Sequence, residues 1–268
     1  RHRRCPHHVG GRGAPPAGGG PPRRLTRPVP SRREPAGAGA DPPVTSPPSH
    51  LDLAAVFARQ RDRDLVGPGP LDDQIRHAEA FAGVADAARA GALTVRPSAA
   101  DGRSGAAGPP RRVIDLGSGG GLPGLVLAVS AWPEAEVALV DSSQRRCTYL
   151  ELEVAPLSPR VKVVWARAEM LGRDDAWRAT ADVVVARSFG PPPVVAECAA
   201  PLLHVGGVLV VSDPPTGGDR WDDEGLRRVG LLRLASPRVD GFGFTVARQV
   251  DPCPDRYPRR RPDRDPIF

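Results

Sequence analysis

Several features are scarce or absent in this chain, and each absence argues against a class of protein. No apolar run in the 268 residues approaches the roughly 18–20 residues that a membrane-spanning helix needs, so we expect no membrane partner. The N-terminus has arginines but no following apolar segment, so we expect no secretory signal. The four cysteines form no Cys-x-x-Cys pair, which argues against a zinc ribbon or a disulfide scaffold. We therefore expect a cytoplasmic protein without a bound metal.

The net charge of +6 is concentrated at one end of the chain. The first fifty residues hold nine arginines and two acidic residues, a net charge of +7, together with twelve of the 33 prolines and eight of the 30 glycines. The rest of the chain holds 28 basic and 29 acidic residues, a net charge of −1. A segment with so little apolar surface does not offset the entropy cost of ordering, so residues 1–48 are predicted to be a disordered tail. The remainder is long enough for one domain.

The remainder of the chain predicts an α/β fold. Residues 49–93 are predicted as a helical cap with helices over 51–66 and 71–90, residues 94–111 as a linker loop, and residues 251–268 as a flexible tail. Strands are predicted over residues 112–116, 137–141, 161–165, 182–186, 207–212, 231–235 and 244–250. Helices are predicted between them over residues 123–131, 144–154, near 174–179, 192–203 and 221–229. This alternation indicates a parallel sheet covered by helices on both faces.

The residues that carry chemistry follow the first predicted strand. Gly119, Gly121 and Gly124 match the Gly-x-Gly-x-x-Gly fingerprint of dinucleotide-binding folds, and Asp141 lies twenty residues past Gly121, where a ribose-binding acid occurs. Glycines allow the sharp turn and the close approach of a ligand to the backbone. No Walker lysine follows these glycines, so phosphoryl transfer is not expected.

A second cofactor fits the same loop. Gly117, Gly119 and Gly121, preceded by Asp115 on the strand, look like the S-adenosyl-L-methionine loop of class I methyltransferases. That cofactor carries an ammonium group and a sulfonium, which a neighbouring carboxylate stabilises, whereas Asp115 would repel a pyrophosphate. Asp141 would bind ribose hydroxyls in either interpretation. The position of Asp115 favours the methyl donor.

A series of short motifs in this chain resembles one family. The motifs are Gly-Leu-Pro-Gly at residues 121–124, Asp-Ser at 141–142 with Arg-Arg at 145–146, Arg-Ala-Glu at 167–169, Ala-Arg-Ser-Phe at 186–189, and Pro-Leu-Leu at 201–203 before Gly-Gly at 206–207. Their order is similar to that of the bacterial 16S ribosomal RNA guanine-N7 methyltransferases, the glucose-inhibited division protein B family. The resemblance covers about residues 71–250.

The resemblance implies a fold, a cofactor and its contacts. It implies a class I methyltransferase with a Rossmann-like, mostly parallel seven-stranded sheet, helices on both faces and a small helical N-terminal cap. S-adenosyl-L-methionine would be the cofactor. By position, Gly117 and Leu122 would contact the cofactor from the first loop. Asp141 would bind the ribose hydroxyls, and Ala168 and Glu169 would contact the adenine.

The resemblance also implies a target, 16S ribosomal RNA or the small ribosomal subunit. Arg187 would lie at the mouth where cofactor and target base meet. Arg145 and Arg146 are candidates for RNA phosphate contact or for ordinary surface charge. Phe189 is a candidate for stacking on a flipped-out base or for packing at the sheet edge. Guanine N7 has an in-plane lone pair, so its methylation needs positioning and no general base.

Departures from the family pattern leave other functions open. The family has a Lys-Gly pair after the fifth strand, where this chain has residues 212–215, Ser-Asp-Pro-Pro. Its Asn-Leu-Thr loop is absent, and only Arg76 and His77 remain of an Arg-His-x-x-Asp-Ser signature. We interpret His77 as a surface residue and Cys198, a possible nucleophile for cytosine methylation, as a core residue. The alternatives are a diverged methyltransferase acting on another RNA or a small molecule, and a non-catalytic cofactor-binding protein.

Overall fold

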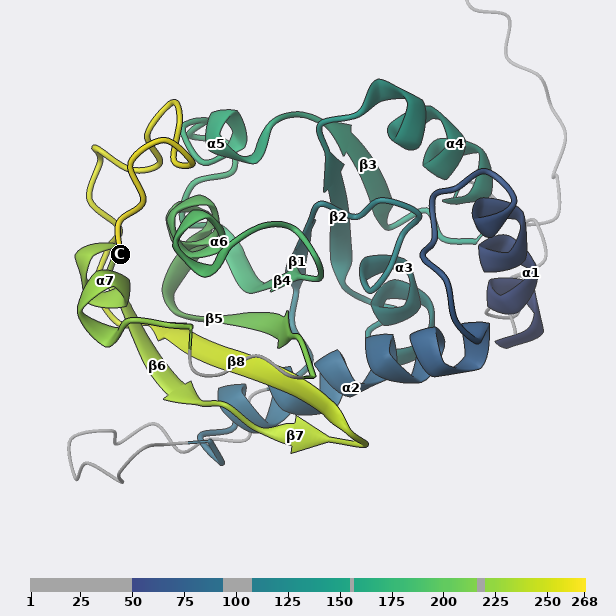
Figure 1. The fold of residues 1–268 in the computed structure, drawn as a ribbon, viewed down its shortest axis with the longest axis horizontal. Helices are drawn as coiled ribbons and strands as arrows, with labels where there is room; N and C mark the ends of the chain where they lie inside the picture. The colour runs from purple at the N-terminus through teal and green to yellow at the C-terminus, as the bar shows by residue number, and fades with distance from the viewer. Residues whose placement is uncertain (1–49, 94–107, 155–156, 216–219) are drawn as a thin grey trace, which may run out of the picture. The chain divides into compact units, whose positions relative to one another are not determined.

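A computed structural model describes residues 50–93, 108–154, 157–215 and 220–268 (Figure 1). The predicted tail over residues 1–48 and residues 94–107 of the predicted linker lie outside the described residues.

A central sheet organises the described residues (Figure 1). Its strands are β1 (Arg112–Leu116), β2 (Glu136–Asp141), β3 (Val161–Trp165), β4 (Ala181–Ala186), β5 (Leu203–Asp213), β6 (Leu231–Ala235), β7 (Arg238–Val239) and β8 (Phe242–Gln249). Their order is β3-β2-β1-β4-β5-β8-β6, and the two-residue β7 pairs with β8 off this path. The first five strands pair in parallel, and β8 is antiparallel to β5 and β6. The seven strands on this path confirm the predicted seven-stranded, mostly parallel sheet.

The strand order reverses at β1. The chain runs outward from β1 through β2 and β3, and then places β4 on the opposite side of β1. Leu116 at the end of β1 pairs with Val140 of β2 and with Ala186 of β4. The residues that follow these three strands therefore meet at one edge, which in open α/β sheets is where ligands bind.

Helices cover both faces of the sheet. One face carries α1 (His50–Arg61), α2 (Leu71–Arg89), α3 (Gly124–Val126), the π-helical turn η1 (Leu127–Ala131) and α4 (Gln144–Val154). The other face carries α5 (Ala168–Leu171), α6 (Pro192–Ala199), the 3-10 turn η2 (Ala200–Leu202) and α7 (Asp223–Arg228). No helix in the described part of the chain is long and apolar enough to span a membrane.

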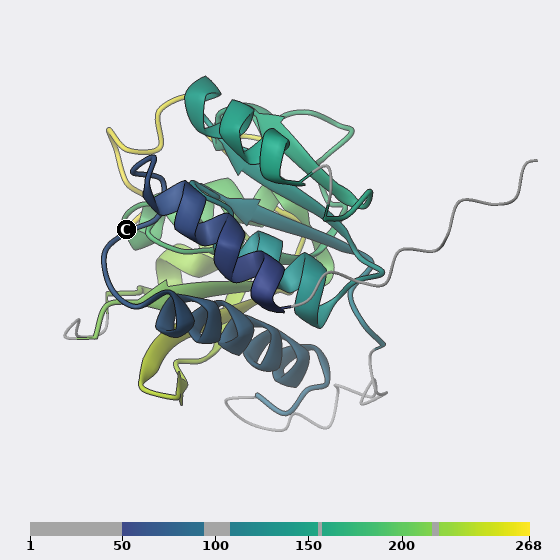
Figure 2. The ribbon, with the colours of Figure 1, turned by 90° about the vertical axis from the view of Figure 1, so that its right-hand side faces the viewer.

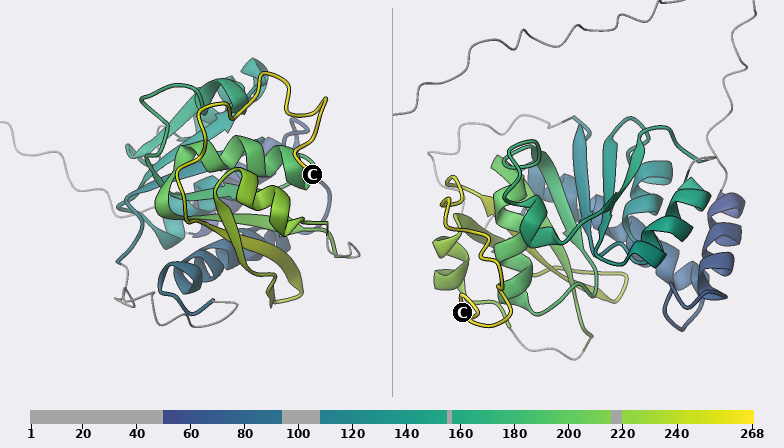
Figure 3. Two further views of the ribbon diagram at one scale, coloured as in Figure 1. Left: turned by 90° about the vertical axis from the view of Figure 1, so that its left-hand side faces the viewer. Right: turned by 90° about the horizontal axis from the view of Figure 1, so that it is seen from above.

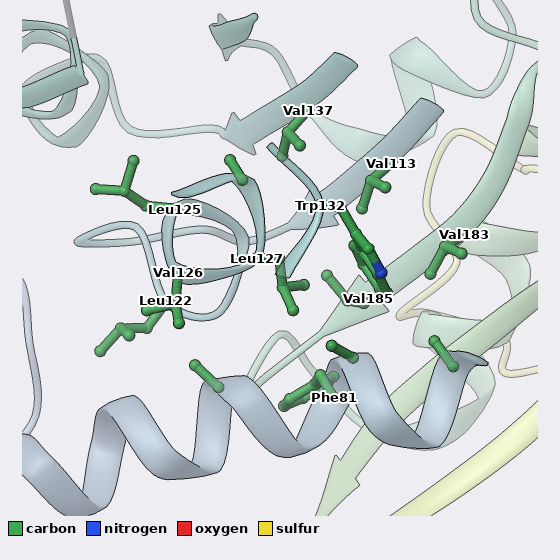
Figure 4. Packing of buried hydrophobic residues seen from close by; sticks show 14 of the residues in the cluster. Phe81, Val113, Leu122, Leu125, Val126, Leu127, Trp132, Val137, Val183 and Val185 are labelled. Atoms are coloured by element: carbon green, nitrogen blue, oxygen red, sulfur yellow. The ribbon is translucent and has the colours of Figure 1, made fainter. Parts of the chain in front are cut away.

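Alternation along the strands divides the core between these faces. Val113, Val183 and Val185 belong to one cluster with Phe81 of α2 (Figure 4). Ile114, next along β1, belongs to the cluster on the opposite face. Such strands, rich in branched apolar residues and buried on both sides, are typical of parallel sheets.

The predicted helical cap packs directly on the sheet. Helix α1 lies between α2 and α4 (Figure 2), where Arg59 and Arg63 both form ion pairs with Glu153 of α4, at 2.6 and 2.9 Å. Helix α1 ends at Arg61, earlier than predicted, and Asp64 just beyond it adopts a left-handed φ of +59°. The connection to α2 therefore becomes a loop that reaches the edge where the strands end.

Other helices are shorter than predicted, and the helix predicted near residues 174–179 is absent from the structure. Residues 174–179 form turns rather than a helix, because Ala179 has a left-handed φ of +54° and its amide hydrogen-bonds to the Pro201 carbonyl. The helix here is α5, which begins directly after β3. Helix α6 gives way to η2 before β5 begins at Leu203, and α7 begins at Asp223, where Asp222 accepts a hydrogen bond from the Gly225 amide.

The C-terminal segment differs most from its prediction. Residues 251–268 contain no helix or strand, but they pack against the body of the protein rather than fraying as predicted. Tyr257 and Ile267 are buried in the same cluster as α6 and α7. The segment follows these two helices in both views of Figure 3.

Candidate cofactor and substrate cavities

The loop after β1 depends on glycine. Gly117, Gly119 and Gly121 all have positive φ angles. Gly117 has a φ of +73°, and a Cβ atom added to it would lie 2.8 Å from Cδ2 of Phe189. Glycine at this position therefore permits both the turn and the close approach of the ring that follows β4.

Asp115 supports the loop from below. Its side chain is fully buried, and its Oδ2 accepts a 2.9 Å hydrogen bond from the amide of Gly124 at the start of α3. Its Oδ1 has no protein partner. Burial raises the pKa of this carboxyl to about 7, a rise that the Gly124 amide and the charge of Arg187 partly offset. Asp115 thus anchors α3 and lines neither of the two cavities described below. Its place beside the cofactor ammonium stays a prediction.

Asp141 links the loop to the end of β2. Its Oδ2 accepts a 3.0 Å hydrogen bond from the amide of Gly119, and its Oδ1 accepts one of 2.9 Å from the amide of Ser143. Nη1 of Arg146 lies 3.4 Å from Oδ2. Unlike Asp115, this carboxylate lines an open cavity.

That cavity, which we call the loop cavity, has a volume of about 370 Å³. It is lined by the ends of β1, β2, β3 and β4 and by part of the C-terminal segment, and its walls include Gly117, Asp141, Ala168, Glu169 and Pro262. Glu169 is mostly buried and pairs with Nε of Arg167. The loop cavity therefore brings together four of the residues predicted to bind the cofactor.

A second cavity of about 650 Å³ adjoins the first. We call it the α2 cavity, because Gln74 and His77 of α2 line it together with Arg187, Phe242 and residues 211–215 at the end of β5. Residues 188–190 line both cavities. The two cavities are therefore neighbours along this short segment.

Arg187 crosses from β4 toward α2. Its Nη2 donates a 2.7 Å hydrogen bond to Oε1 of Gln74, while its buried Nη1 has no protein partner. Burial lowers the pKa of this guanidinium, although the nearby charge of Asp115 partly counteracts the effect. An arginine remains charged in proteins, so this buried donor calls for a partner outside the protein chain, such as a water molecule or a ligand.

His77 is not the surface residue that the sequence suggested. Its ring stacks on Phe242, with centroids 4.3 Å apart and planes at 6°, and it also contacts Phe81 and Phe244. Burial, with the charge of Arg187, lowers the pKa of His77 from 6.5 to about 4, so the imidazole is neutral at pH 7. Its buried Nε2 has no protein partner.

Comparison with known proteins decides the family. The family model described as rRNA small subunit methyltransferase G (GidB) matches residues 104–213. The protein of that name from Roseiflexus castenholzii is 38% identical over 162 residues, which cover 56% of this chain and 67% of that protein. This chain belongs to the rRNA small subunit methyltransferase G family. The Prochlorococcus marinus (strain MIT 9313) protein of the same name is 48% identical over 160 residues, covering 56% of this chain and 64% of that protein.

A solved structure agrees with the fold of this chain. An O-methyltransferase from Streptomyces achromogenes, solved in complex with SAM, matches with a TM-score of 0.50 at 18% identity, covering 77% of this chain and 93% of that one. Family membership confirms the resemblance drawn from the sequence, and with it the predicted methyltransferase class and the cofactor S-adenosylmethionine.

Not every predicted cofactor residue of this methyltransferase reaches the loop cavity. Leu122 is buried in the core beneath the loop, and Gly119 and Gly121 shape the loop without lining the cavity. Arg187 lines the α2 cavity rather than the loop cavity. The burial of Cys198 raises the pKa of its thiol, which fits its interpretation as a core residue.

The three predicted substrate residues have different surroundings. Phe189 lies against Gly117 and lines both cavities. Arg146 lines the loop cavity beside Asp141. Arg145 lines neither cavity described here, and its Nη2 donates a 3.2 Å hydrogen bond to the carbonyl of Arg63.

Sequence reasoning missed residues from both ends of the chain. Gln74 and His77 lie more than a hundred residues before Arg187, and Pro262 and Asp263 come from the segment predicted to fray. The remnant of the Arg-His signature was the one available signal for His77. Nothing in the composition of the C-terminal segment signalled its contribution.

Proposed function

We propose that this chain methylates N7 of a guanine in 16S ribosomal RNA, in the cytoplasm, with S-adenosylmethionine in the loop cavity and the guanine in the α2 cavity. The observation that carries the proposal is the junction of the two cavities at residues 188–190. A methyl donor and its acceptor must lie about 3 Å apart and in line for transfer, which adjoining cavities permit.

The loop cavity suits the cofactor chemically. Asp141 offers a carboxylate at the end of β2, next to a glycine loop that allows close approach of a ligand to the backbone. Ribose hydroxyls would compete with the Gly119 and Ser143 amides for its oxygens. Ala168 and Glu169 would then lie beside the adenine. When bound, S-adenosylmethionine supplies an electrophilic methyl group on a sulfonium.

The α2 cavity suits a guanine. N7 and O6 on one edge of guanine are both hydrogen-bond acceptors, and an arginine commonly donates to that edge. Nη1 of Arg187 is a free donor for O6, which would orient the neighbouring N7 toward the loop cavity. The stacked His77 and Phe242 provide an aromatic surface at the same cavity. A neutral His77 adds no positive charge beside a base that becomes cationic on N7 methylation.

No residue needs to remove a proton in this reaction, because the N7 lone pair is available for attack. The protein contributes position and exclusion of water. Phe189 packs on Gly117 and lines both cavities, so it would lie beside both the cofactor and the base.

Transfer of a labelled methyl group from S-adenosylmethionine tests the proposal against both alternatives. We expect label in 16S ribosomal RNA when small ribosomal subunits or their RNA are supplied. Label in another RNA alone would favour a diverged methyltransferase. Cofactor binding without transfer to any of these RNAs would contradict the proposed reaction and favour the remaining alternatives.

A further inference from the structure

The C-terminal segment, residues 251–268, is fixed to the body of the protein at several places. Arg178 donates to the carbonyls of Cys253 and Tyr257, at 2.7 and 2.9 Å. Arg228 of α7 donates a 3.1 Å hydrogen bond to the carbonyl of Ile267. These side chain to backbone contacts hold a segment that has no regular structure of its own.

The strongest of these attachments joins Arg259 to Glu197. The Glu197 side chain, on α6, is 0% exposed. Its Oε1 accepts from the backbone amide and Nε of Arg259, at 2.7 and 2.9 Å, and its Oε2 accepts from Nη2 at 2.7 Å. A buried carboxylate needs such compensation, because an unpaired charge there is strongly destabilising. The position of residue 259 is therefore set by α6.

Three residues farther on, the segment reaches the loop cavity. Pro262 is buried and Asp263 is exposed, and both line this cavity. The turn after β3 lines it as well, with Arg167, Ala168 and Glu169. The charge of Asp263, a smaller contribution than the hydrogen bond from Arg167 to Glu169, helps to raise the pKa of Arg167.

The order of the groups around the loop cavity indicates which part of a bound cofactor Pro262 and Asp263 would contact. The glycine loop follows β1, Asp141 ends β2, and the Arg167–Glu169 turn follows β3, the next strand outward. If Asp141 holds the ribose, the base lies beyond it, toward the β3 turn and the C-terminal segment. A proline ring offers an apolar surface to the base, and a carboxylate accepts a hydrogen bond from an exocyclic amine.

We propose that Pro262 and Asp263 form a wall of the cofactor site and contribute directly to the binding of its adenine base. This inference rests on the proposed use of the loop cavity for S-adenosylmethionine. The segment lies outside residues 104–213, so it adds to the site from beyond the region that the family model matches.

Isothermal titration of the full chain with S-adenosylhomocysteine, the demethylated cofactor, tests the proposal without turnover. We expect Pro262→Gly and Asp263→Ala each to weaken binding about tenfold. Arg260→Ala, an exposed residue of the same segment, serves as the matched control and should keep the parental affinity. Thermal unfolding without ligand should give Asp263→Ala and Arg260→Ala the parental midpoint, because both residues are exposed. Pro262→Gly removes a buried ring and makes the unfolded chain more flexible, so its affinity is compared at a temperature well below its own midpoint.

Base selectivity provides a second readout. S-inosylhomocysteine replaces the exocyclic amine with a carbonyl oxygen, which a carboxylate repels. The parent should prefer the adenosine compound, and Asp263→Ala should lose part of that preference. If both wall variants kept the parental affinity and selectivity, the inference about the wall would be overturned and the proposed function would stand. An equal loss of affinity in Arg260→Ala would have the same consequence. Failure of the parent to bind either the cofactor or S-adenosylhomocysteine would overturn the proposed function as well.

Discussion

Nη2 of Arg187, directly after β4, donates a 2.7 Å hydrogen bond to Oε1 of Gln74 on α2. The two residues lie 113 positions apart in the sequence. Their contact makes α2 a wall of the cavity where we propose that the target base binds. Helix α2 therefore contributes to the candidate site as well as to the core.

Arg187→Ala should lower kcat/KM for methyl transfer about a hundredfold, because the base would lose the group that orients it. Affinity for S-adenosylmethionine should change little, since Arg187 does not line the loop cavity. Single-turnover transfer and isothermal titration separate the two effects. Arg76→Ala, which replaces an exposed arginine on α2, the helix that carries Gln74, is the control. A large loss of cofactor affinity in Arg187→Ala with unchanged transfer at saturating cofactor would assign Arg187 to the cofactor instead.

A pair of glycine substitutions tests the packing beneath the first loop. A Cβ at Gly124 would lie 2.4 Å from Cδ2 of Leu139 and 2.7 Å from Oδ2 of Asp115, so Gly124→Ala should lower the free energy of unfolding by about 1–3 kcal/mol. Gly83 in α2 has nothing within 4 Å of the added atom, so Gly83→Ala should raise it by about 0.5–1 kcal/mol. Urea titration measures both. Equal effects of the two substitutions would contradict the described packing.

The pH dependence of stability should show two opposing contributions. The pKa of His77 is lowered to about 4 in the folded protein, so the unfolded chain takes up a proton at this histidine first as the pH falls. The stability that the neutral His77 contributes is therefore complete above pH 6.5 and is lost as the pH falls from 6.5 toward 4. The pKa of Asp115 is raised to about 7, so folding takes up a proton there, and stability falls as the pH rises from about 4 to 7. Arg187 faces both groups, and Asp141 also faces Asp115.

Single substitutions should separate these contributions. The stability of the parent relative to His77→Gln should fall as the pH is lowered from 6.5 to 4. The stability of the parent relative to Asp115→Asn should fall as the pH is raised from 4 to 7. Urea unfolding of each protein across this range provides the measurement. Differences that do not vary with pH would show that these two groups titrate alike in the folded and unfolded chains.

Removal of residues 1–48 tests the role of the basic end of the chain. Cofactor affinity should stay at the parental value, because the loop cavity is lined by residues from Gly117 to Asp263. The slope of log affinity for RNA against log salt concentration should decrease in magnitude by about 0.7 for each RNA phosphate that the removed arginines had neutralised. Filter binding at several salt concentrations gives that slope. An unchanged slope would mean that the arginines of this segment do not contact RNA.

The sequence predicted the sheet well, because its strands are runs of branched apolar residues separated by turns. It also predicted the glycine loop and Asp141, which follow directly from strands β1 and β2. The helix predicted near residues 174–179 was wrong, because the left-handed backbone of Ala179 has no signal in the sequence. The role of the C-terminal segment depends on Arg259 meeting a buried Glu197 that lies 62 residues earlier, a tertiary contact without local signal. The stacking of His77 on Phe242 is likewise long-range.

The central claim is most directly tested by mapping the methylated nucleotide. After incubation of small ribosomal subunits with the full chain and S-adenosylmethionine, reduction and aniline cleavage break the RNA at N7-methylguanine. We expect one new cleavage site in 16S ribosomal RNA, absent without cofactor and strongly reduced with Arg187→Ala. Methyl incorporation without new cleavage at any guanine would contradict N7 of guanine as the target.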